Sequence, residues 1–346
     1  MISNWLEFTK NNFGTAFWAE PLTMVLMTTA LLLCVYAPYF AINYYVKSKW
    51  LADAQARVGP SRSGKNGFLQ PLVNVLKLNQ KHGYQPPDTT VGLLSIVSII
   101  IIFSLAPSMP LSQNLLLIDS DYSLLYGVLV PILYGLILFW IAQSRKDYRD
   151  FTTHMRWLSL LFVSSFCMLA VALMAGINTG SLSWVAQVQS QEADFLGLGI
   201  FRNPPFGLVA PVIYTVVGVN LFFVREGYLF LENKIWSGVE LMIFNLTRAF
   251  LETVFSITAV GLFFGGWNLP FGLESIIPAV GMVTSLQVIW VLLKSFLFYQ
   301  TVQLLLQPVS KMDVEQLLAL YWKYTVPASL CCLLGTGGYI WIKAHL

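Results

Sequence analysis

Residues 50–78 read WLADAQARVGPSRSGKNGFLQPLVNVLKL and form the most polar and glycine-rich part of a very apolar chain. Long apolar runs lie on both sides of this stretch. Its glycines and Pro60 interrupt regular helix, and Gln70-Pro71 then opens a short amphipathic run with leucines at near-helical spacing. The backbone groups of such a loop need water, because lipid offers them no hydrogen-bond partners. The stretch therefore predicts a water-facing loop between membrane spans.

The composition excludes a soluble globular domain. The chain has 346 residues, of which 56% are hydrophobic and only 11% are charged, and its mean hydropathy is +0.67. Soluble domains carry about a quarter charged residues. The sequence thus predicts a polytopic helical membrane protein without a sizeable soluble domain. The N-terminal residues lack the pattern of a cleaved signal peptide, so none is expected.

Eight apolar segments predict an all-α fold with about eight transmembrane helices, because each is near or above the ~20 residues that a helix needs to cross the hydrocarbon. We expect residues 1–346 to form a single membrane-embedded helical domain. Pro38 should kink the first span. The predicted spans are about 21–46, 91–107, 122–143, 157–177, 205–224, 236–265, 275–299 and 324–342, with a large loop at 47–90.

The distribution of basic residues predicts the orientation. Fifteen of the twenty Lys and Arg residues fall in the loops after the first, third, fifth and seventh predicted spans. Only three fall at the termini or in the other loops. Basic loops stay on the cytoplasmic side, so loop 47–90 should be cytoplasmic and both termini should lie opposite. The expected location is an inner (plasma) membrane of the bacterial type, crossed several times.

Two short patterns carry a resemblance to a known family. The first reads Gln55-x-Arg57-x-Gly59-Pro60, Arg62-x-Gly64, Gly67-x-Leu69-Gln70-Pro71 and Lys77-Leu78. The second is Phe263-Phe264-Gly265-Gly266-Trp267, which is similar to LFLGGW, with Trp236-Ser237-Gly238 upstream where the family has YSG. Together they resemble the membrane-embedded H subunit of respiratory complex I, the NADH-quinone oxidoreductase, and its relatives in membrane-bound hydrogenases. The resemblance covers about residues 20–340.

This resemblance implies a subunit of a translocase that couples electron transport to proton transport. It implies that the loop docks a peripheral arm and walls part of a quinone chamber, through Gln55, Arg57, Gly59, Pro60, Arg62, Gly64, Gly67, Gln70, Pro71 and Lys77. Partner subunits would carry the NADH site and the iron–sulfur clusters, and antiporter-like subunits would complete the membrane arm. The chain would bind no redox cofactor alone and would catalyse nothing alone, and quinone would be the substrate of the assembly.

The basic loop also has a simpler interpretation. Arg57, Arg62 and Lys65 could meet anionic lipid at the inner leaflet and do nothing else. The fixed glycines and Gln70-Pro71 favour instead a shaped loop that holds a protein partner.

Four charged residues fall inside predicted spans, where charge is costly and usually faces a bundle interior. Arg248 and Glu252 are four residues apart and can pair on one helix face, and Glu240 lies about two turns before Arg248. These three could form a polar track that conducts protons, or a buried pair that only fixes helix packing. Lys294 has no evident partner in its own helix, so its partner is expected on another helix or chain.

Several family acids are replaced in this chain. Where the family has AEY, this chain has Thr247-Arg248-Ala249, so a base stands in place of an acid. The other replacements are Lys47 before the loop, Asn74 within it, Ser165 in the fourth span and Gly207 near the fifth, and only Glu226 and Glu232 remain nearby in the acidic loop. The chain is thus expected to be a divergent member that keeps its place in the assembly better than its proton path.

Metal and nucleotide sites are not expected. The three histidines are scattered, the four cysteines form no C-x-x-C pair, and no glycine-rich phosphate loop follows a strand. The alternatives are a subunit of a membrane-bound hydrogenase, an ion- or carbon-uptake relative, and a stand-alone secondary transporter in which Lys294 and Glu240 bind substrate. The two halves do not look like inverted copies, which weakens the transporter alternative.

Overall fold

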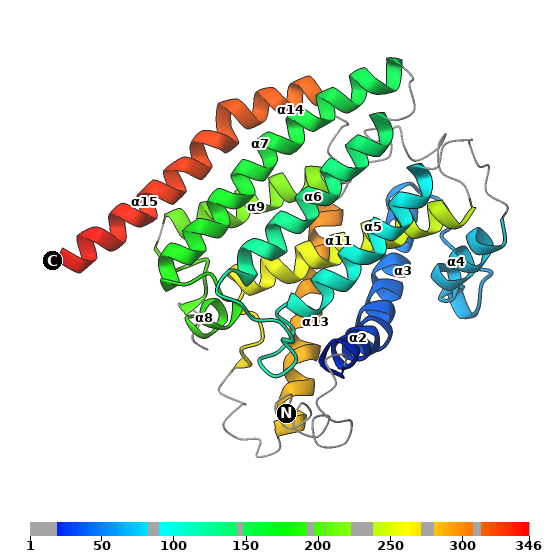
Figure 1. The fold of residues 1–346 in the computed structure, drawn as a ribbon, viewed down its shortest axis with the longest axis horizontal. Helices are drawn as coiled ribbons and strands as arrows, with labels where there is room; N and C mark the ends of the chain where they lie inside the picture. Colours follow the sequence, from blue (N-terminus) through cyan, green and yellow to red (C-terminus); the bar gives the residue numbers. More distant parts are fainter. Residues whose placement is uncertain are drawn as a thin grey trace.

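The structure is a computed structural model that describes residues 19–81, 90–143, 148–191, 197–203, 205–222, 238–270, 280–306 and 313–345. The described residues are helices and their connections, without a strand among them, which confirms the predicted all-α class (Figure 1). The principal helices are α2 (Ala19–Leu31), α3 (Ala37–Ala54), α4 (Gln70–Gln80), α5 (Thr90–Leu105), α6 (Ser123–Gln143), α7 (Tyr148–Thr179), α8 (Trp184–Gln189), α9 (Phe206–Phe222), α11 (Gly238–Phe263), α13 (Val280–Leu306), α14 (Val314–Leu320) and α15 (Val326–His345).

Five of the described helical segments are long and apolar enough to cross a membrane, which agrees with a polytopic membrane protein. They are Thr23–Ala54, Leu158–Thr179, Leu241–Phe263, Gly281–Leu306 and Val314–Lys343, and three shorter apolar helices are Ile96–Ser108, Ser123–Leu136 and Phe206–Val219. Several helices run past the predicted spans. The first continues to Ala54 and α7 begins at Tyr148. An apolar run marks where a chain meets lipid, whereas a helix can continue into water with polar side chains.

Helix α11 lies at the centre of the bundle. It packs against α4, α5, α9 and α13, and in Figure 1 it crosses behind α5 and α6. Within its most apolar window 83% of the residues are buried, against 22% for α2–α3 and for α13. Neighbouring helices therefore surround α11, and its buried Thr247, Glu252, Thr253, Ser256 and Thr258 face protein rather than lipid.

Two single π-helical turns precede prolines. Leu32–Tyr36 forms one of them directly before Ala37-Pro38, and Tyr321–Thr325 forms the other directly before Val326-Pro327. A proline donates no backbone hydrogen bond, and its ring clashes with the carbonyl four residues earlier. The wider π turn makes room for that carbonyl. The sequence predicts a kink at Pro38, and the structure shows this change of winding just before it while the helix continues.

Candidate functional site

Loop 55–69 has a specific backbone conformation. Asn66, Gly64 and Gly67 have positive φ angles of 57°, 75° and 82°. A Cβ atom added to Gly67 would lie 2.1 Å from the carbonyl oxygen of Pro60, so the two arms of the loop touch at this point. Only glycine combines this φ with such a close approach. The glycine spacing in the sequence therefore reflects a folded loop.

The loop is held on α3 by side chains. The Tyr45 hydroxyl donates to the carbonyl oxygen of Asn66 at 3.1 Å, and the Tyr45 ring packs edge-on against Phe68 at 5.5 Å between centroids. These contacts fix the tip of the loop against the end of the first membrane helix.

A chain of polar side chains then ties the loop to α4 and α3. Ser63 donates to Gln70 at 2.7 Å, the Gln70 amide donates to Asn74 at 2.8 Å, and the Asn74 amide donates to the Tyr44 hydroxyl at 3.0 Å. Gln70 thus has a structural role, and Pro71 beside it is buried at the start of α4. Asn74 accepts from Gln70 and donates to Tyr44, so it connects the loop to α3.

The outer surface of the loop and α4 carries both charge and apolar side chains. Gln55, Arg57, Arg62 and Lys77 are exposed, and Arg57 donates to Gln55 at 2.7 Å. The large apolar side chains on the same surface are also exposed: Trp50, Val58, Phe68, Leu69, Leu72 and Leu76. Exposed apolar side chains gathered on one surface indicate contact with a protein or a membrane.

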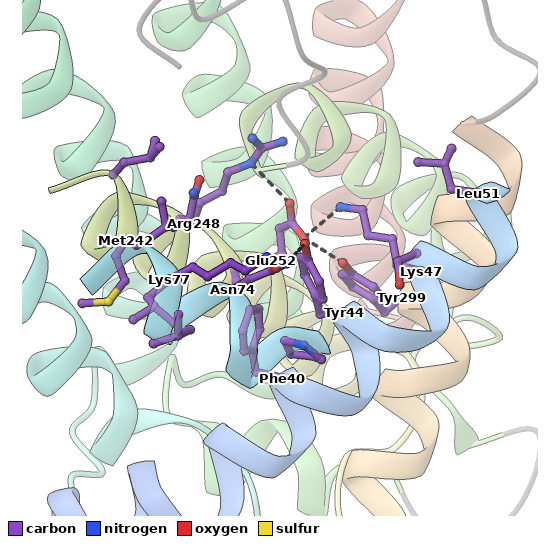
Figure 2. A pocket seen from close by; sticks show the side chains of 18 of the residues that line it. Phe40, Tyr44, Lys47, Leu51, Asn74, Lys77, Met242, Arg248, Glu252 and Tyr299 are labelled. Atoms are coloured by element: carbon purple, nitrogen blue, oxygen red, sulfur yellow. Dashed lines mark hydrogen bonds and ion pairs between the residues drawn. The ribbon is translucent and has the colours of Figure 1, made fainter. Parts of the chain in front are cut away.

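A carboxylate on α11 joins the loop region to the membrane helices. Glu252 is 5% exposed, and its Oε1 lies 3.4 Å from Nε of Arg248, as the four-residue spacing predicts. Its Oε2 lies 3.5 Å from Nζ of Lys47 on α3 and accepts a hydrogen bond of 2.8 Å from the Tyr299 hydroxyl on α13. Figure 2 shows these three groups meeting at the carboxylate. The carboxylate therefore links α11 to both α3 and α13 through two cations and a hydroxyl donor.

Sequence reasoning missed Lys47 and Tyr299 as partners of Glu252. Both belong to a buried polar seam between α3 and α13, in which Tyr39 bonds to Ser295 at 2.8 Å. The seam has a weak signal in the sequence, since Tyr39 and Asn43, and likewise Ser295 and Tyr299, are four residues apart in otherwise apolar runs. Such spacing places two polar side chains on one helix face.

A cavity of about 620 Å³ lies where α3, α4 and α11 meet, and Figure 2 shows the side chains around it. Its apolar lining includes Phe40, Leu51 and Val75, together with Leu241, Met242 and Leu246 of α11. Its charged lining is Lys47, Arg57, Lys77, Lys81, Arg248 and Glu252. The cavity therefore brings together residues from both predicted groups: Arg57, Pro71 and Lys77 of the docking loop, and Arg248 and Glu252 of the intramembrane track.

Lys294 lies apart from this cluster. Its ammonium donates to the carbonyl oxygens of Phe264 at 2.9 Å and Gly266 at 3.0 Å, and it lies 5.0 Å from the centroid of the Trp290 ring. The predicted partner on another helix is thus the backbone turn that ends α11. In that turn Gly265 and Gly266 have positive φ angles of 73° and 45°, and Trp267 is buried.

We expect Lys294→Met to lower the free energy of unfolding by about 2 kcal/mol, because a hydrogen bond from a charged donor contributes roughly 1.5–3 kcal/mol. Methionine keeps the length of the side chain but leaves two carbonyl oxygens without this donor. Thermal unfolding of the purified protein in detergent measures the change. Lys323→Met, at an exposed position, serves as the control. Equal unfolding midpoints for the two variants would show that the hydrogen bonds of Lys294 to Phe264 and Gly266 do not stabilise the protein.

Some predicted residues cannot be placed. The side chain of Glu240 lies outside the described residues, as do Glu226, Glu232, Trp236 and Ser237. Within the described part of the chain, no group of three or more His, Cys, Asp or Glu side chains is arranged to hold a metal ion.

Comparison with known proteins identifies the family. Residues 24–225 and 230–337 match the family described as NADH dehydrogenase. The chain is 27% identical to the NADH-quinone oxidoreductase H subunit of Paraburkholderia xenovorans (strain LB400), over 93% of this chain and 91% of that protein. It is 26% identical to the protein of the same name from Acidovorax sp. (strain JS42), over 95% of each chain. The chain therefore belongs to the NADH dehydrogenase family, as the loop motif of residues 50–78 indicates.

Proposed function

We propose that this chain is the membrane subunit of a complex I-type oxidoreductase, where it anchors the peripheral arm and walls part of the quinone chamber. The observation that carries the proposal is the cavity between α3, α4 and α11, with the folded loop fixed beside it. The electron donor would be NADH or a ferredoxin. The name shared by the relatives, the H subunit of an NADH-quinone oxidoreductase, supports the same assignment.

The loop suits a docking role because its backbone is fixed while its side chains are available. Arg57, Arg62, Val58 and Phe68 are all exposed on a surface held by Tyr45. Protein interfaces combine apolar anchors with arginine in this way. The basic residues favour a cytoplasmic position for this surface.

The cavity suits a quinone because its two kinds of lining match the two parts of that molecule. Phe40, Leu51 and Leu246 offer apolar contact for an isoprenoid tail, and Tyr44 and Asn74 offer polar groups near a ring carbonyl. This chain would supply walls and positioning groups only. The oxidation of the donor and the iron–sulfur clusters would belong to peripheral partner subunits, and antiporter-like subunits would extend the membrane arm.

The cluster around Glu252 suits a coupling role. A charge that enters or leaves the cavity acts on Glu252, Lys47 and Arg248 together, because all three line it and lie within ion-pair distance. Glu252 also reaches α13 through Tyr299. We propose that Arg248 and Glu252, together with Glu240 earlier on α11, take over part of the coupling that other acids perform in the family.

We expect Arg248→Leu to lower the number of protons transported per reduced quinone molecule about fivefold or more. A factor of about five corresponds to the lower end of typical coupling free energies between two sites. The variant removes the cation on α11 that forms an ion pair with Glu252 one turn later. Proton uptake and quinone reduction would be measured together in membrane vesicles, with the exposed Lys323→Leu as the control. Loss of the assembled complex would contradict a specific coupling role.

The proposed function itself is tested by purifying the chain from native membranes in mild detergent and identifying the proteins that accompany it. Iron–sulfur and antiporter-like subunits, together with NADH- or ferredoxin-driven quinone reduction, are the expected result. Hydrogenase subunits with hydrogen evolution would move the assignment to that relative. A stable protein without partners would overturn the proposal in favour of a transporter.

A further inference from the structure

The charge around the cavity is unbalanced. Its described lining contains five cationic side chains, Lys47, Arg57, Lys77, Lys81 and Arg248, and one carboxylate, Glu252. Glu252 already compensates Lys47 and Arg248. Arg57 donates its Nε to a neutral amide, and neither Lys77 nor Lys81 has an ion pair with a described residue. Among the described residues, the loop and α4 therefore give the cavity a net positive lining.

Helices α3, α4 and α11 each contribute apolar and cationic side chains to the lining, and two of the cations lie together at the end of α4. Leu241, Met242 and Leu246 belong to membrane-spanning α11, whereas Lys77 and Lys81 lie at the end of α4. The neighbouring Leu72 and Leu76 of α4 are exposed. An amphipathic helix with exposed leucines and terminal lysines is typical of a helix that lies in the membrane interface. The cavity thus combines apolar side chains with a pair of lysines at the end of an amphipathic helix.

We propose that this cavity binds an anionic phospholipid, with its phosphate-bearing headgroup held by Lys77, Lys81 and Arg57 and its acyl chain along α11. The volume of about 620 Å³ accommodates a headgroup and the first part of an acyl chain, but not a whole lipid. The remaining chain would lie along the exposed leucines of α4. Bound lipid would occupy the cavity proposed above for quinone, so the two molecules would exclude each other there.

A lipid fits these observations better than an acidic protein segment. A peptide bound only by charge would need cations on a polar surface, whereas here nine apolar side chains line the same cavity. Anionic lipid offers both parts at once, at the depth where lysines meet headgroups. The inference depends on the cavity and its charges, and it holds whichever reaction the assembly catalyses.

The test is lipid binding to the assembly purified from native membranes, measured by native mass spectrometry after removal of endogenous lipid. Separate titrations would use dioleoylphosphatidylglycerol, dioleoylphosphatidylcholine and inorganic phosphate. We expect tight binding of dioleoylphosphatidylglycerol only. The double variant Lys77→Gln/Lys81→Gln should bind this lipid about 25-fold more weakly, because each lysine near the surface contributes about fivefold. Lys65→Gln/Lys323→Gln removes two exposed lysines that do not line the cavity and is the matched control.

Four outcomes would overturn the proposal. Equal binding of the two lipids would mean that the charges do not select the headgroup. Equal loss in the two double variants would mean diffuse attraction to the basic surface. Displacement of the lipid by millimolar inorganic phosphate would identify a site for the free anion. Binding that depends on a co-purified peripheral subunit would favour a protein segment. Because binding is measured directly, loss of quinone reduction would count against the proposed function and not against this site.

Discussion

Glu252→Gln is expected to lower the free energy of unfolding by about 3 kcal/mol. This is the lower end of the cost of removing one partner of a buried ion pair. The substitution keeps the shape of the side chain but removes the negative charge that pairs with Lys47 and with Arg248. We place the cost at the lower end because the two cations are 31% and 21% exposed and are partly screened by water. The hydroxyl of Tyr299 also loses a charged acceptor.

The measurement is thermal unfolding of the purified protein, followed by a double-mutant cycle with Lys47→Met. If Lys47 and Glu252 interact as the structure shows, the double variant will be more stable than the sum of the single changes predicts, by about 0.5–3 kcal/mol. Asp53→Asn, at an exposed position of α3, removes a carboxylate without breaking a buried pair and serves as the control. Additive effects would show that the two residues do not interact in solution.

Glu252 is the carboxylate around which this cluster forms. Lys47 on α3 lies 3.5 Å from its Oε2, and Arg248 on α11 lies 3.4 Å from its Oε1. Two cations close together inside a bundle would be strongly unfavourable without an anion. Glu252, one turn after Arg248, supplies that anion and contacts both cations. The carboxylate therefore joins α3 to α11 through its two ion pairs.

Much of the fold could be predicted from the sequence, because apolar runs that are long enough to cross a membrane have few alternatives. The pairing of Arg248 with Glu252 was predictable for the same local reason, since four residues make about one helical turn. The folded loop was predictable from its glycines. All three inferences depend on residues close together in the chain.

Contacts between distant residues could not be predicted. Lys47 and Glu252 are 205 positions apart in the numbering, and nothing in either neighbourhood specifies the other. The partner of Lys294 was expected on another helix or chain, but the sequence could not identify it, because Lys294 binds two backbone carbonyl oxygens, which every residue carries. The cavity forms where one face of each of the helices α3, α4 and α11 meets the others. Helix packing sets that arrangement, and packing between distant segments cannot be predicted from one sequence.

Gly67→Ala is expected to disrupt the loop and to cost about 3 kcal/mol, since a strained backbone conformation costs about 1–3 kcal/mol and a clash is added here. An alanine would have to adopt a φ of 82° with its Cβ 2.1 Å from the Pro60 carbonyl oxygen. That atom belongs to the backbone, so no side-chain rotation can relieve the contact. The loop must open, which separates Asn66 from Tyr45 and Ser63 from Gln70.

Limited proteolysis with trypsin measures this opening, because Arg62 and Lys65 lie beside the glycine and are exposed. In membranes that contain the variant we expect faster cleavage at these two positions and less of the chain incorporated into its complex. Gly337→Ala is the matched control, since a Cβ at Gly337 meets nothing within 4 Å and its φ is not positive. If Gly67→Ala were cleaved and incorporated like Gly337→Ala, the folded loop would not be what holds the peripheral partner, and exposed Arg57 and Arg62 would have to act without a fixed backbone.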